Sequence, residues 1–372
     1  MADELIVDIE KRFPSGFVVA AEWSAPMRGG TILVLFGPSG AGKTTVVRSI
    51  AGLERPERGR IQFSGDTWFD ADAQRWTDPQ QRHVGYVGQK PALFPHLTVR
   101  ANVEYGLSDQ SGADRARRVD EMLALVELAE FGGRYPRELS SGQGQRIALA
   151  RAIAPQPRLL LLDEPFGALD APARSRLRSL LRSVVDRTGI SAVLVTHDRT
   201  EAIALGDQMV VLAEGRVRQV GPVFDVFRRP ADLVVARSVG VESVVLARIA
   251  GAEDGLVLLK VGDATIRAVA VEPVDDIEID RQHPDVFACI RAEDVVLERA
   301  APSSASARNH WPGRIVGVES EGPLERVTVD CGFPLVALIT RQAREEMALT
   351  TGAPVVAAVK ATAVHLVARR SG

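Results

Sequence analysis

Several features that define special classes of protein are scarce or missing in this sequence. Its 372 residues include two cysteines, Cys289 and Cys331, which are too few and too isolated for a disulfide framework or a zinc site. No apolar run approaches the roughly 18 residues that a membrane-spanning helix needs. Residues 1–4 are acidic and lack the pattern of a signal peptide. We therefore expect a protein that is kept in the cytosol and reaches a membrane only through a partner.

The sequence also lacks a strong excess of charge of either sign. Lysine and arginine number 45 and aspartate and glutamate 48, so the net charge is −3. This balance gives no general basic field for binding nucleic acid or anionic lipid. Apolar residues make up 46% and charged residues 25%, as in ordinary globular proteins, and the length is sufficient for two domains.

A glycine-rich loop at residues 37–44 is the first motif with a clear chemistry. It fits the pattern Gly-x-x-x-x-Gly-Lys-Ser/Thr at every fixed position, between an apolar strand pattern at 31–36 and a segment that can continue as a helix. Backbone N–H groups of such a loop surround phosphate oxygens, and the helix start adds its positive dipole end. Lys43 is expected to reach the β- and γ-phosphates, and the Thr44 hydroxyl to bind Mg²⁺. The expected nucleotide contacts are Gly37, Pro38, Ser39, Gly40, Ala41, Gly42, Lys43, Thr44 and Thr45.

Two other apolar runs end in residues suited to phosphate chemistry. Residues 159–162 are four leucines, as expected for a strand buried on both faces of a parallel sheet. This strand would deliver Asp163 to the Mg²⁺ shell and Glu164 to the attacking water as general base. The run 192–196 ends at His197, for which a γ-phosphate contact is favoured over a structural role.

The stretch between these sites indicates which kind of nucleoside triphosphatase (NTPase) the motifs predict. Residues 139–146 read Leu-Ser-Ser-Gly-Gln-Gly-Gln-Arg and resemble the LSGGQ signature of ATP-binding cassette (ABC) ATPases. Gln89 matches that family's Q-loop, residues 167–170 its D-loop and His197 its H-loop. On these motifs, residues 1–235 are identified as a member of the ABC family, with a helical subdomain at about 90–155.

The resemblance implies an α/β fold and further site roles. It implies a P-loop core and a head-to-tail homodimer, in which the signature of one subunit caps the γ-phosphate bound by the other. Gln89 and His197 would join Lys43 and Glu164 as catalytic residues, and the metal ligands would be Thr44, Gln89 and Asp163. Further nucleotide contacts that it implies are Phe13, Ser140, Gly142, Gln143 and Asp170.

Three positions leave alternatives open. Phe13 lies where the family stacks an aromatic ring on adenine, but Phe17 competes with it, and core packing is open to either ring. Ser141 replaces the usual first glycine of the signature, which costs roughly 1–2 kcal/mol if the residue needs positive φ and nothing otherwise. Gly88 replaces a bulkier residue before Gln89 and is expected to make this loop more flexible. Neither change removes a catalytic group, so we expect an active ATPase.

A leucine and valine stripe at 177–185 has helical spacing. Arginines are interleaved with it, and we interpret them as a solvated face rather than a binding patch. They are Arg174, Arg176, Arg178 and Arg182.

Beyond residue 235 the sequence changes to short β-strand patterns with polar turns. Residues 236–308 are interpreted as a β-rich connecting and regulatory region. Residues 309–368 resemble the Mop/TOBE domain, an all-β barrel of the OB type that binds molybdate or tungstate in importer ATPases. The resemblance implies Thr340, Lys360 and Thr362 as oxyanion ligands, with a dimer contact that binds no anion as the alternative.

These motifs predict the ATP-hydrolysing subunit of an ABC importer for molybdate or tungstate, with ATP and Mg²⁺ as cofactors. Its partners would be integral-membrane permease subunits, at whose cytoplasmic face it would be peripheral, and an extracytoplasmic binding protein. Leu93, Phe94 and Leu97 are candidates for the permease contact, or for ordinary core. Because permease and binding protein choose the cargo, sulfate, iron(III), polyamine or sugar is the alternative. A soluble ABC ATPase acting on nucleic acid or ribosomes is disfavoured, since the chain has one cassette and no long heptad array.

Overall fold

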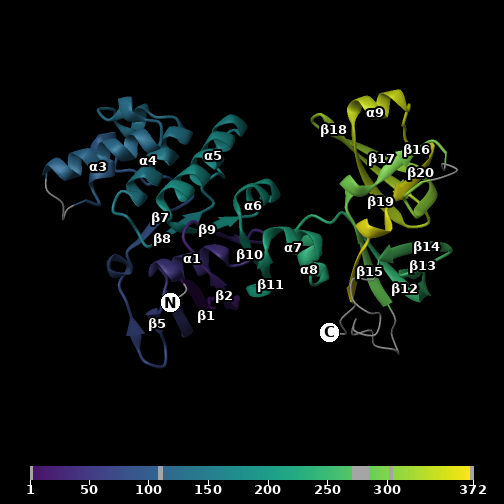
Figure 1. The fold of residues 1–372 in the computed structure, drawn as a ribbon, viewed down its shortest axis with the longest axis horizontal. Coiled ribbons are helices and arrows are strands. Elements are labelled where there is room, and N and C mark those ends of the chain that lie inside the picture. The colour runs from purple at the N-terminus through teal and green to yellow at the C-terminus, as the bar shows by residue number, and fades with distance from the viewer. Residues whose placement is uncertain (1–2, 108–111, 270–284, 301–304, 369–372) are drawn as a thin grey trace. The chain divides into compact units, whose positions relative to one another are not determined.

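The computed structural model describes residues 3–107, 112–269, 285–300 and 305–368 (Figure 1). The chain divides into two compact units, Met1–Val226 and Phe227–Gly372, which are described separately. Among the helices in these ranges, none combines the length and apolar character that crossing a membrane requires.

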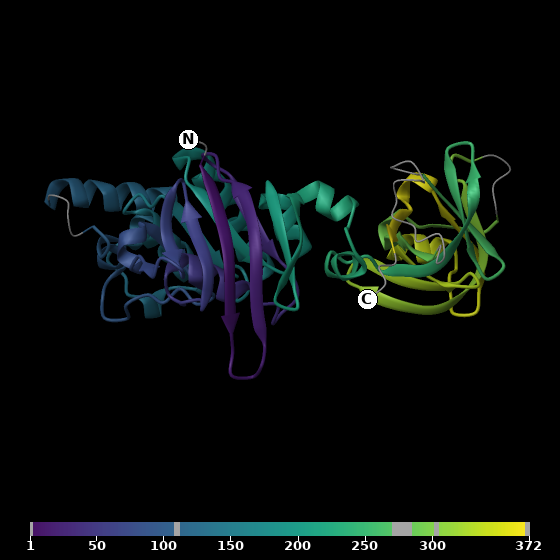
Figure 2. The same cartoon turned by 90° about the horizontal axis from the view of Figure 1, so that it is seen from below.

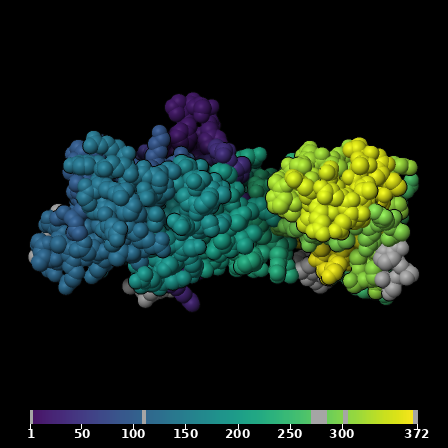
Figure 3. Space-filling view, turned by 90° about the horizontal axis from the view of Figure 1, so that it is seen from above, coloured from purple at the N-terminus to yellow at the C-terminus, as the bar shows by residue number. Residues whose placement is uncertain are grey.

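The first unit is built on a sheet that has eleven strands in the described part of the chain. Their order is β6-β5-β4-β1-β2-β11-β10-β3-β9-β8-β7 (Figure 1). The run from β10 to β7 is parallel, and β1, β2, β4, β5 and β6 form an antiparallel wing. Figures 2 and 3 both show the β1–β2 hairpin, in purple, projecting from this unit. The strands are β1 (Glu4–Arg12), β2 (Val18–Pro26), β3 (Ile32–Phe36), β4 (Arg58–Phe63), β5 (Asp66–Asp70), β6 (Arg75–Trp76), β7 (Val84–Val87), β8 (Leu159–Asp163), β9 (Ser191–Thr196), β10 (Gln208–Ala213) and β11 (Arg216–Pro222).

Every residue of β3, β8 and β9 is buried, as the unbroken apolar runs predicted for central parallel strands. Parallel strands present their carboxyl ends at one edge, so the residues after β3, β8 and β9 meet there. The helices of this unit are α1 (Lys43–Ala51), α2 (Val99–Glu104), α3 (Gly112–Leu125), α4 (Ser141–Ile153), α5 (Ala171–Thr188), α6 (Arg199–Leu205) and α7 (Val223–Arg228), with short 3₁₀ turns at Pro79–Arg82, Ala129–Phe131 and Pro136–Glu138.

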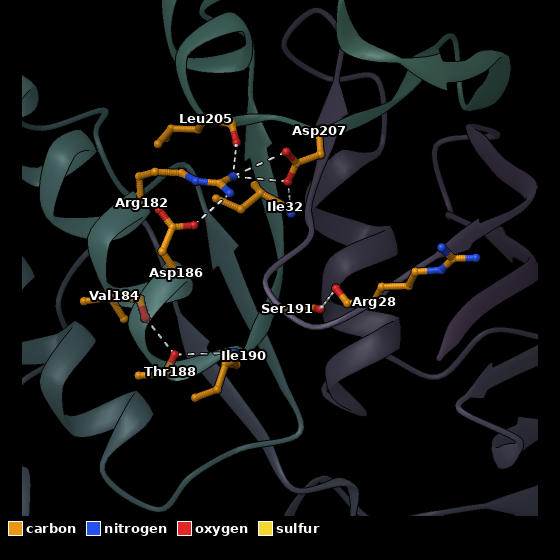
Figure 4. Close-up of polar contacts among 10 residues, drawn as sticks. All are labelled: Arg28, Ile32, Arg182, Val184, Asp186, Thr188, Ile190, Ser191, Leu205 and Asp207. Carbon is orange, nitrogen blue, oxygen red and sulfur yellow. Dashed lines mark hydrogen bonds and ion pairs between the residues drawn. The ribbon is translucent and has the colours of Figure 1, made fainter. Parts of the chain in front are cut away.

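Polar contacts fix the opposite edge of the parallel sheet (Figure 4). Arg182 of α5 forms ion pairs with Asp186 at 2.8 Å and with Asp207 at 3.2 Å. Asp207 also accepts a hydrogen bond from the backbone N–H of Ile32 at 2.8 Å, so it joins the start of β3 to α5. The Ser191 hydroxyl donates to the carbonyl of Arg28 at 2.9 Å. Arg182 therefore anchors α5 to this edge while its side chain stays 36% exposed, so its interpretation as part of a solvated face remains a prediction.

The second unit is mainly β-structure. Its two five-stranded sheets have the orders β14-β13-β12-β15-β21 and β16-β20-β17-β18-β19, and both contribute to one apolar core. Trp311 and Phe333 meet edge to face in that core, with ring centroids 5.2 Å apart. The strands are β12 (Ser243–Glu253), β13 (Leu256–Val261), β14 (Ala264–Val269), β15 (Asp285–Ile290), β16 (Val296–Glu298), β17 (Asn309–Glu321), β18 (Leu324–Asp330), β19 (Pro334–Thr340), β20 (Pro354–Val359) and β21 (His365–Ala368). The helices are α8 (Leu233–Ser238) and α9 (Arg341–Glu346), with 3₁₀ turns at Ala292–Asp294 and Ala361–Ala363.

The regions 236–308 and 309–368 are interleaved in this unit. Strand β15 pairs with β21, and β16 pairs with β20, so each sheet takes strands from both regions. One strand from the other region thus completes each sheet, β21 in the first and β16 in the second, and this pairing between distant strands is not visible in the local sequence pattern.

Candidate nucleotide site

The loop between β3 and α1 adopts a backbone that requires glycine. Gly37 has φ +151°, and a Cβ there would lie 1.9 Å from the carbonyl oxygen of Leu212. Gly42 has φ +99°, and a Cβ there would lie 2.6 Å from a methyl group of Val19. Both positions therefore exclude a side chain, and the loop reaches the start of α1 in the conformation expected of a phosphate-binding loop.

Lys43 is the first residue of α1 and is only 4% exposed. Its ammonium group donates to the carbonyls of Gly37 and Pro38, each at 2.8 Å, so the side chain lies across the loop. Burial lowers the pKa of Lys43, while the charges of Glu164 and Asp163 act in the opposite direction. The lysine is thus a buried cation beside two carboxylates, as a site for phosphate and a divalent metal requires.

The end of β8 meets the start of α1 at Asp163. The Thr44 hydroxyl donates to one carboxylate oxygen at 3.0 Å, and the Tyr86 hydroxyl donates to the other at 3.3 Å. Burial raises the pKa of Asp163, and these two hydrogen bonds lower it. Burial, followed by the charge of Asp163, raises the pKa of Tyr86 to about 12. An adjacent hydroxyl and carboxylate form the kind of oxygen donor set that suits Mg²⁺, which takes few ligands from the protein when it binds phosphate.

Glu164 lies where three segments converge. One carboxylate oxygen is 3.4 Å from Nδ1 of His197, and the other accepts from the amide of Gln89 at 3.5 Å. Glu164 has φ +47°, an uncommon conformation for a residue with a side chain, and its N–H is held by the carbonyl of Val195 at 3.2 Å. The structure thus brings together the glutamate, histidine and glutamine that the sequence placed in three separate motifs.

The signature segment begins helix α4. Ser140 is its N-cap, accepting from the N–H of Gln143 at 3.3 Å, while the Gln143 side chain accepts from the N–H of Ser140 at 2.9 Å. Ser141 is the first helical residue and is not among the described residues with positive φ, so a serine costs nothing there. Gly142 is buried, and its Cβ would lie 3.0 Å from that of Ala173.

A contact outside the predicted set joins the Q-loop to the signature helix. The Gln145 side chain donates to the carbonyl of Gly88 at 3.2 Å. A Cβ at Gly88 would make only ordinary contacts, the nearest being 3.5 Å from the Tyr86 ring. Sterics therefore do not require a glycine at position 88.

Three other predicted contacts lie as follows. Asp170 is the N-cap of α5 and accepts from the N–H of Ala173 at 2.8 Å. Phe13 follows β1 and packs partly against the core, with its ring centroid 6.2 Å from that of Phe17. Phe17 is 36% exposed, so the choice between the two rings remains a prediction.

The oxyanion candidates of the second unit fall into two places. Lys360 and Thr362 line a groove of about 690 Å³ together with Ser306, Arg267 and Arg308, and with the acidic Glu253 and Asp254. Thr340 does not line this groove. Its hydroxyl caps α9 by accepting from the N–H of Ala343 at 3.1 Å.

Comparison with known proteins found two matching family models and relatives that are similar over most of the chain. Residues 22–167 match the family model of the ABC transporter, and residues 305–366 match that of the TOBE domain. The chain is 38% identical over 348 residues to the sulfate/thiosulfate import ATP-binding protein CysA of Thermosynechococcus vestitus, covering 92% of each chain. It is 43% identical over 283 residues to the protein of the same name from Caulobacter vibrioides, covering 74% of this chain and 80% of that one.

A solved structure agrees with the fold of the first unit. It is the dimeric structure of a post-hydrolysis state of the ATP-binding cassette MJ0796 bound to ADP and Pi. The likeness has a TM-score of 0.51 at 30% identity and covers 59% of this chain and 98% of that one.

Fold and site together define a P-loop ATPase of the cassette type, with an α/β core followed by a β-rich domain of the OB type, which confirms the expected fold class. The chain belongs to the ABC transporter family, as an ATP-binding subunit with a C-terminal TOBE domain.

Proposed function

We propose that this ATPase drives the import of sulfate or thiosulfate. The similarity to proteins named for that import, which in one case extends over 92% of both chains, supports this cargo. It favours the alternative that the sequence left open over molybdate or tungstate, for which the relatives described above give no support. The proposal that the chain hydrolyses ATP rests on one observation. Glu164, His197 and Gln89 lie together beside the Thr44–Asp163 pair.

The geometry supports a direct role for each group in hydrolysis. Residues 37–45 would surround the phosphates, with Lys43 exchanging its two carbonyl partners for phosphate oxygens. Glu164 would take a proton from a water molecule as the water oxygen bonds to the γ-phosphorus and the bond to the β–γ bridging oxygen breaks. His197 would contact the γ-phosphate and hold Glu164 in place. Thr44, Asp163 and Gln89 would hold Mg²⁺, which supplies positive charge at the phosphates.

A second copy of the chain would complete this site. Ser140 and Asp170 lie exposed at the first turns of α4 and α5 and would reach the partner's nucleotide region with Gly142 and Gln143. Because the Ser140 hydroxyl accepts its capping hydrogen bond, its own proton can donate to a phosphate oxygen. The 30% identical MJ0796 cassette, whose structure is dimeric, supports this arrangement.

The loop before α2 is suited to a permease contact at the cytoplasmic face of the membrane. Asn102 is fully buried and bonds to the N–H of Phe94 and to the carbonyls of Phe94, Leu97 and Thr98, which holds the loop in one conformation. Phe94 packs on Tyr105 with ring centroids 4.3 Å apart, and Tyr105 is 64% exposed. An aromatic pair of this kind, with Phe94 half-buried and Tyr105 exposed, can accept an apolar helix of another subunit.

The groove of the second unit would be the oxyanion site, with Lys360 and Thr362 as ligands and Arg267 and Arg308 as further cations. Thr340 is not part of this proposal, since it caps α9. Isothermal titration of the full chain with sulfate, thiosulfate and molybdate tests it. Lys360→Ala should abolish the binding heat without changing basal ATP hydrolysis, and wild-type chain that gives no heat with any of the three anions would reject the site.

Uptake by cells tests the cargo. Disruption of the gene should abolish accumulation of ³⁵S-labelled sulfate, and the wild-type gene should restore it while a Glu164→Gln gene should not. Unchanged sulfate and thiosulfate uptake, with loss of labelled molybdate uptake, would overturn the proposed cargo and return the assignment to molybdate.

A further inference from the structure

One arginine of the first unit contacts two catalytic loops at once. Arg174 lies in the first turn of α5, directly after the D-loop at residues 167–170. It donates to the carbonyl of Leu169 at 3.3 Å, and its guanidinium lies 3.8 Å from the carboxylate of Asp198 and 4.0 Å from that of Glu201. Asp198 follows His197 in the chain, so Arg174 joins the D-loop to the histidine loop.

Hydrogen bonds also join the residues on either side of His197 to helix α6. Thr196 donates to the carboxylate of Glu201 and accepts from the N–H of Asp198 at 3.0 Å. Asp198 in turn caps α6 by accepting from the N–H of Glu201 at 3.0 Å. The residues before and after His197 are therefore both held, although the His197 side chain is 55% exposed.

Because Glu201 is buried, the contacts around His197 should be sensitive to the loss of the Arg174 charge. Glu201 is 5% exposed, and its burial raises its pKa, with Thr196 and Arg174 acting in the opposite direction. The Nε atom of Arg174 is also buried and has no hydrogen-bond partner among the residues that the structure describes, and it lies 4.0 Å from the Glu201 carboxylate. Removing the Arg174 charge would leave the buried Glu201 carboxylate with less compensation, and the loop would shift to relieve it.

We propose that Arg174 is a positioning residue for hydrolysis, which acts through Asp198 and Glu201 to hold His197 against Glu164 and, through the Leu169 carbonyl, ties that geometry to the D-loop. This inference rests on the role proposed for His197 and adds a residue that none of the sequence motifs includes.

Kinetics of the purified full chain test the inference. Arg174→Ala should lower kcat by about 10- to 100-fold, the effect of a displacement of about 1 Å in a catalytic group, with KM for ATP changed less than about twofold. Arg174→Lys should restore only part of the rate, because one ammonium group cannot replace a planar fork with three acceptors. Arg178→Ala is the matched control, since Arg178 lies one turn further along α5 in a groove with Ser179 and Arg182, and it should leave kcat unchanged.

A double-mutant cycle separates positioning from general stability. If Arg174 acts through His197, adding Arg174→Ala to His197→Ala should cost little further rate in single-turnover assays. If the fold losses in rate of the two single variants multiply in the double variant, the inference is overturned and the role of His197 is unaffected. A His197→Ala chain with wild-type turnover would overturn both. If Arg174→Ala does not fold, Asp198→Asn gives the same test, because asparagine keeps the cap of α6 and loses the ion pair. A wild-type rate in Asp198→Asn would then contradict the proposal.

Discussion

Replacing Glu164 by glutamine removes the proposed base and changes little else. Glutamine has the same shape, so it can keep the contact with Gln89 and the backbone bond to Val195. The loss should therefore fall on the chemical step. We expect turnover to fall at least about 10²-fold, equivalent to about 2.7 kcal/mol in the barrier, because general-base catalysis contributes that much. ATP binding should persist, and two chains should remain closed around unhydrolysed nucleotide.

The assay is phosphate release under saturating ATP, with size-exclusion chromatography to detect the trapped dimer. Glu214→Gln is the matched control. Glu214 has a similar φ of +52°, lies in the β10–β11 turn with its side chain 73% exposed, and pairs with Arg218 at 2.6 Å, so its variant should hydrolyse ATP at the wild-type rate. A Glu164→Gln chain with near-normal turnover would refute the assignment of the base and the reasoning from its contacts.

Three other predictions concern Lys43, Arg82 and Tyr86 of the first unit. Lys43→Ala should weaken ATP binding itself, measured by anisotropy of a fluorescent ATP analogue, and an unchanged Kd would contradict the placement of Lys43 on the phosphates. Arg82 is fully buried and donates to four backbone carbonyls, two of them in the last turn of α1. Arg82→Met should therefore lower the free energy of unfolding, measured in urea, by about 3 kcal/mol or more. A loss below about 1 kcal/mol would refute this prediction. Because the pKa of Tyr86 is raised to about 12, the folded chain keeps this proton after the unfolded chain loses it, and stability should fall as the pH rises above about 10, less so in Tyr86→Phe. Equal losses in both chains would contradict this reading.

Local patterns identified the candidate phosphate-binding residues because each motif is short and continuous. The glycine loop, the Asp163–Glu164 pair and the signature each lie at the end of one strand or the start of one helix, where parallel strands bring them together. Their convergence at Glu164 follows from the strand order β3-β9-β8-β7.

Residues that join separate elements were missed, because their contacts are not visible in a short, continuous motif. Tyr86, Gln145 and Arg174 each contact a segment that is far away in the chain, and none was among the predicted site residues. Arg174 and Arg182 were interpreted as solvated, because an arginine between buried leucines on a helix usually faces water. Only the fold shows the carboxylates opposite them, Asp198 and Glu201 in one case and Asp207 in the other.

The second unit shows the limit of sequence patterns for β-structure. The strands of 236–308 were expected to form a region of their own, but β15 and β16 pair with strands from the end of the chain. Pairing between distant strands leaves no trace in local alternation, because each strand shows only which of its faces is buried. The domain boundaries at 235 and 308 thus stay predictions.

The most direct test of the composite site uses two variants of this chain that should each be inactive as homodimers. Lys43→Ala damages the phosphate loop, and Ser140→Asp puts a negative charge where the partner's γ-phosphate would lie while keeping the cap of α4, since aspartate caps as well as serine. Ser140→Asn, which caps without the charge, is the control for the second variant.

In a crosslinked heterodimer of the Lys43→Ala and Ser140→Asp chains, one site carries both changes and the other carries neither. The composite site predicts that this heterodimer hydrolyses ATP well above either crosslinked homodimer. Activity no higher than that of the homodimers would contradict it.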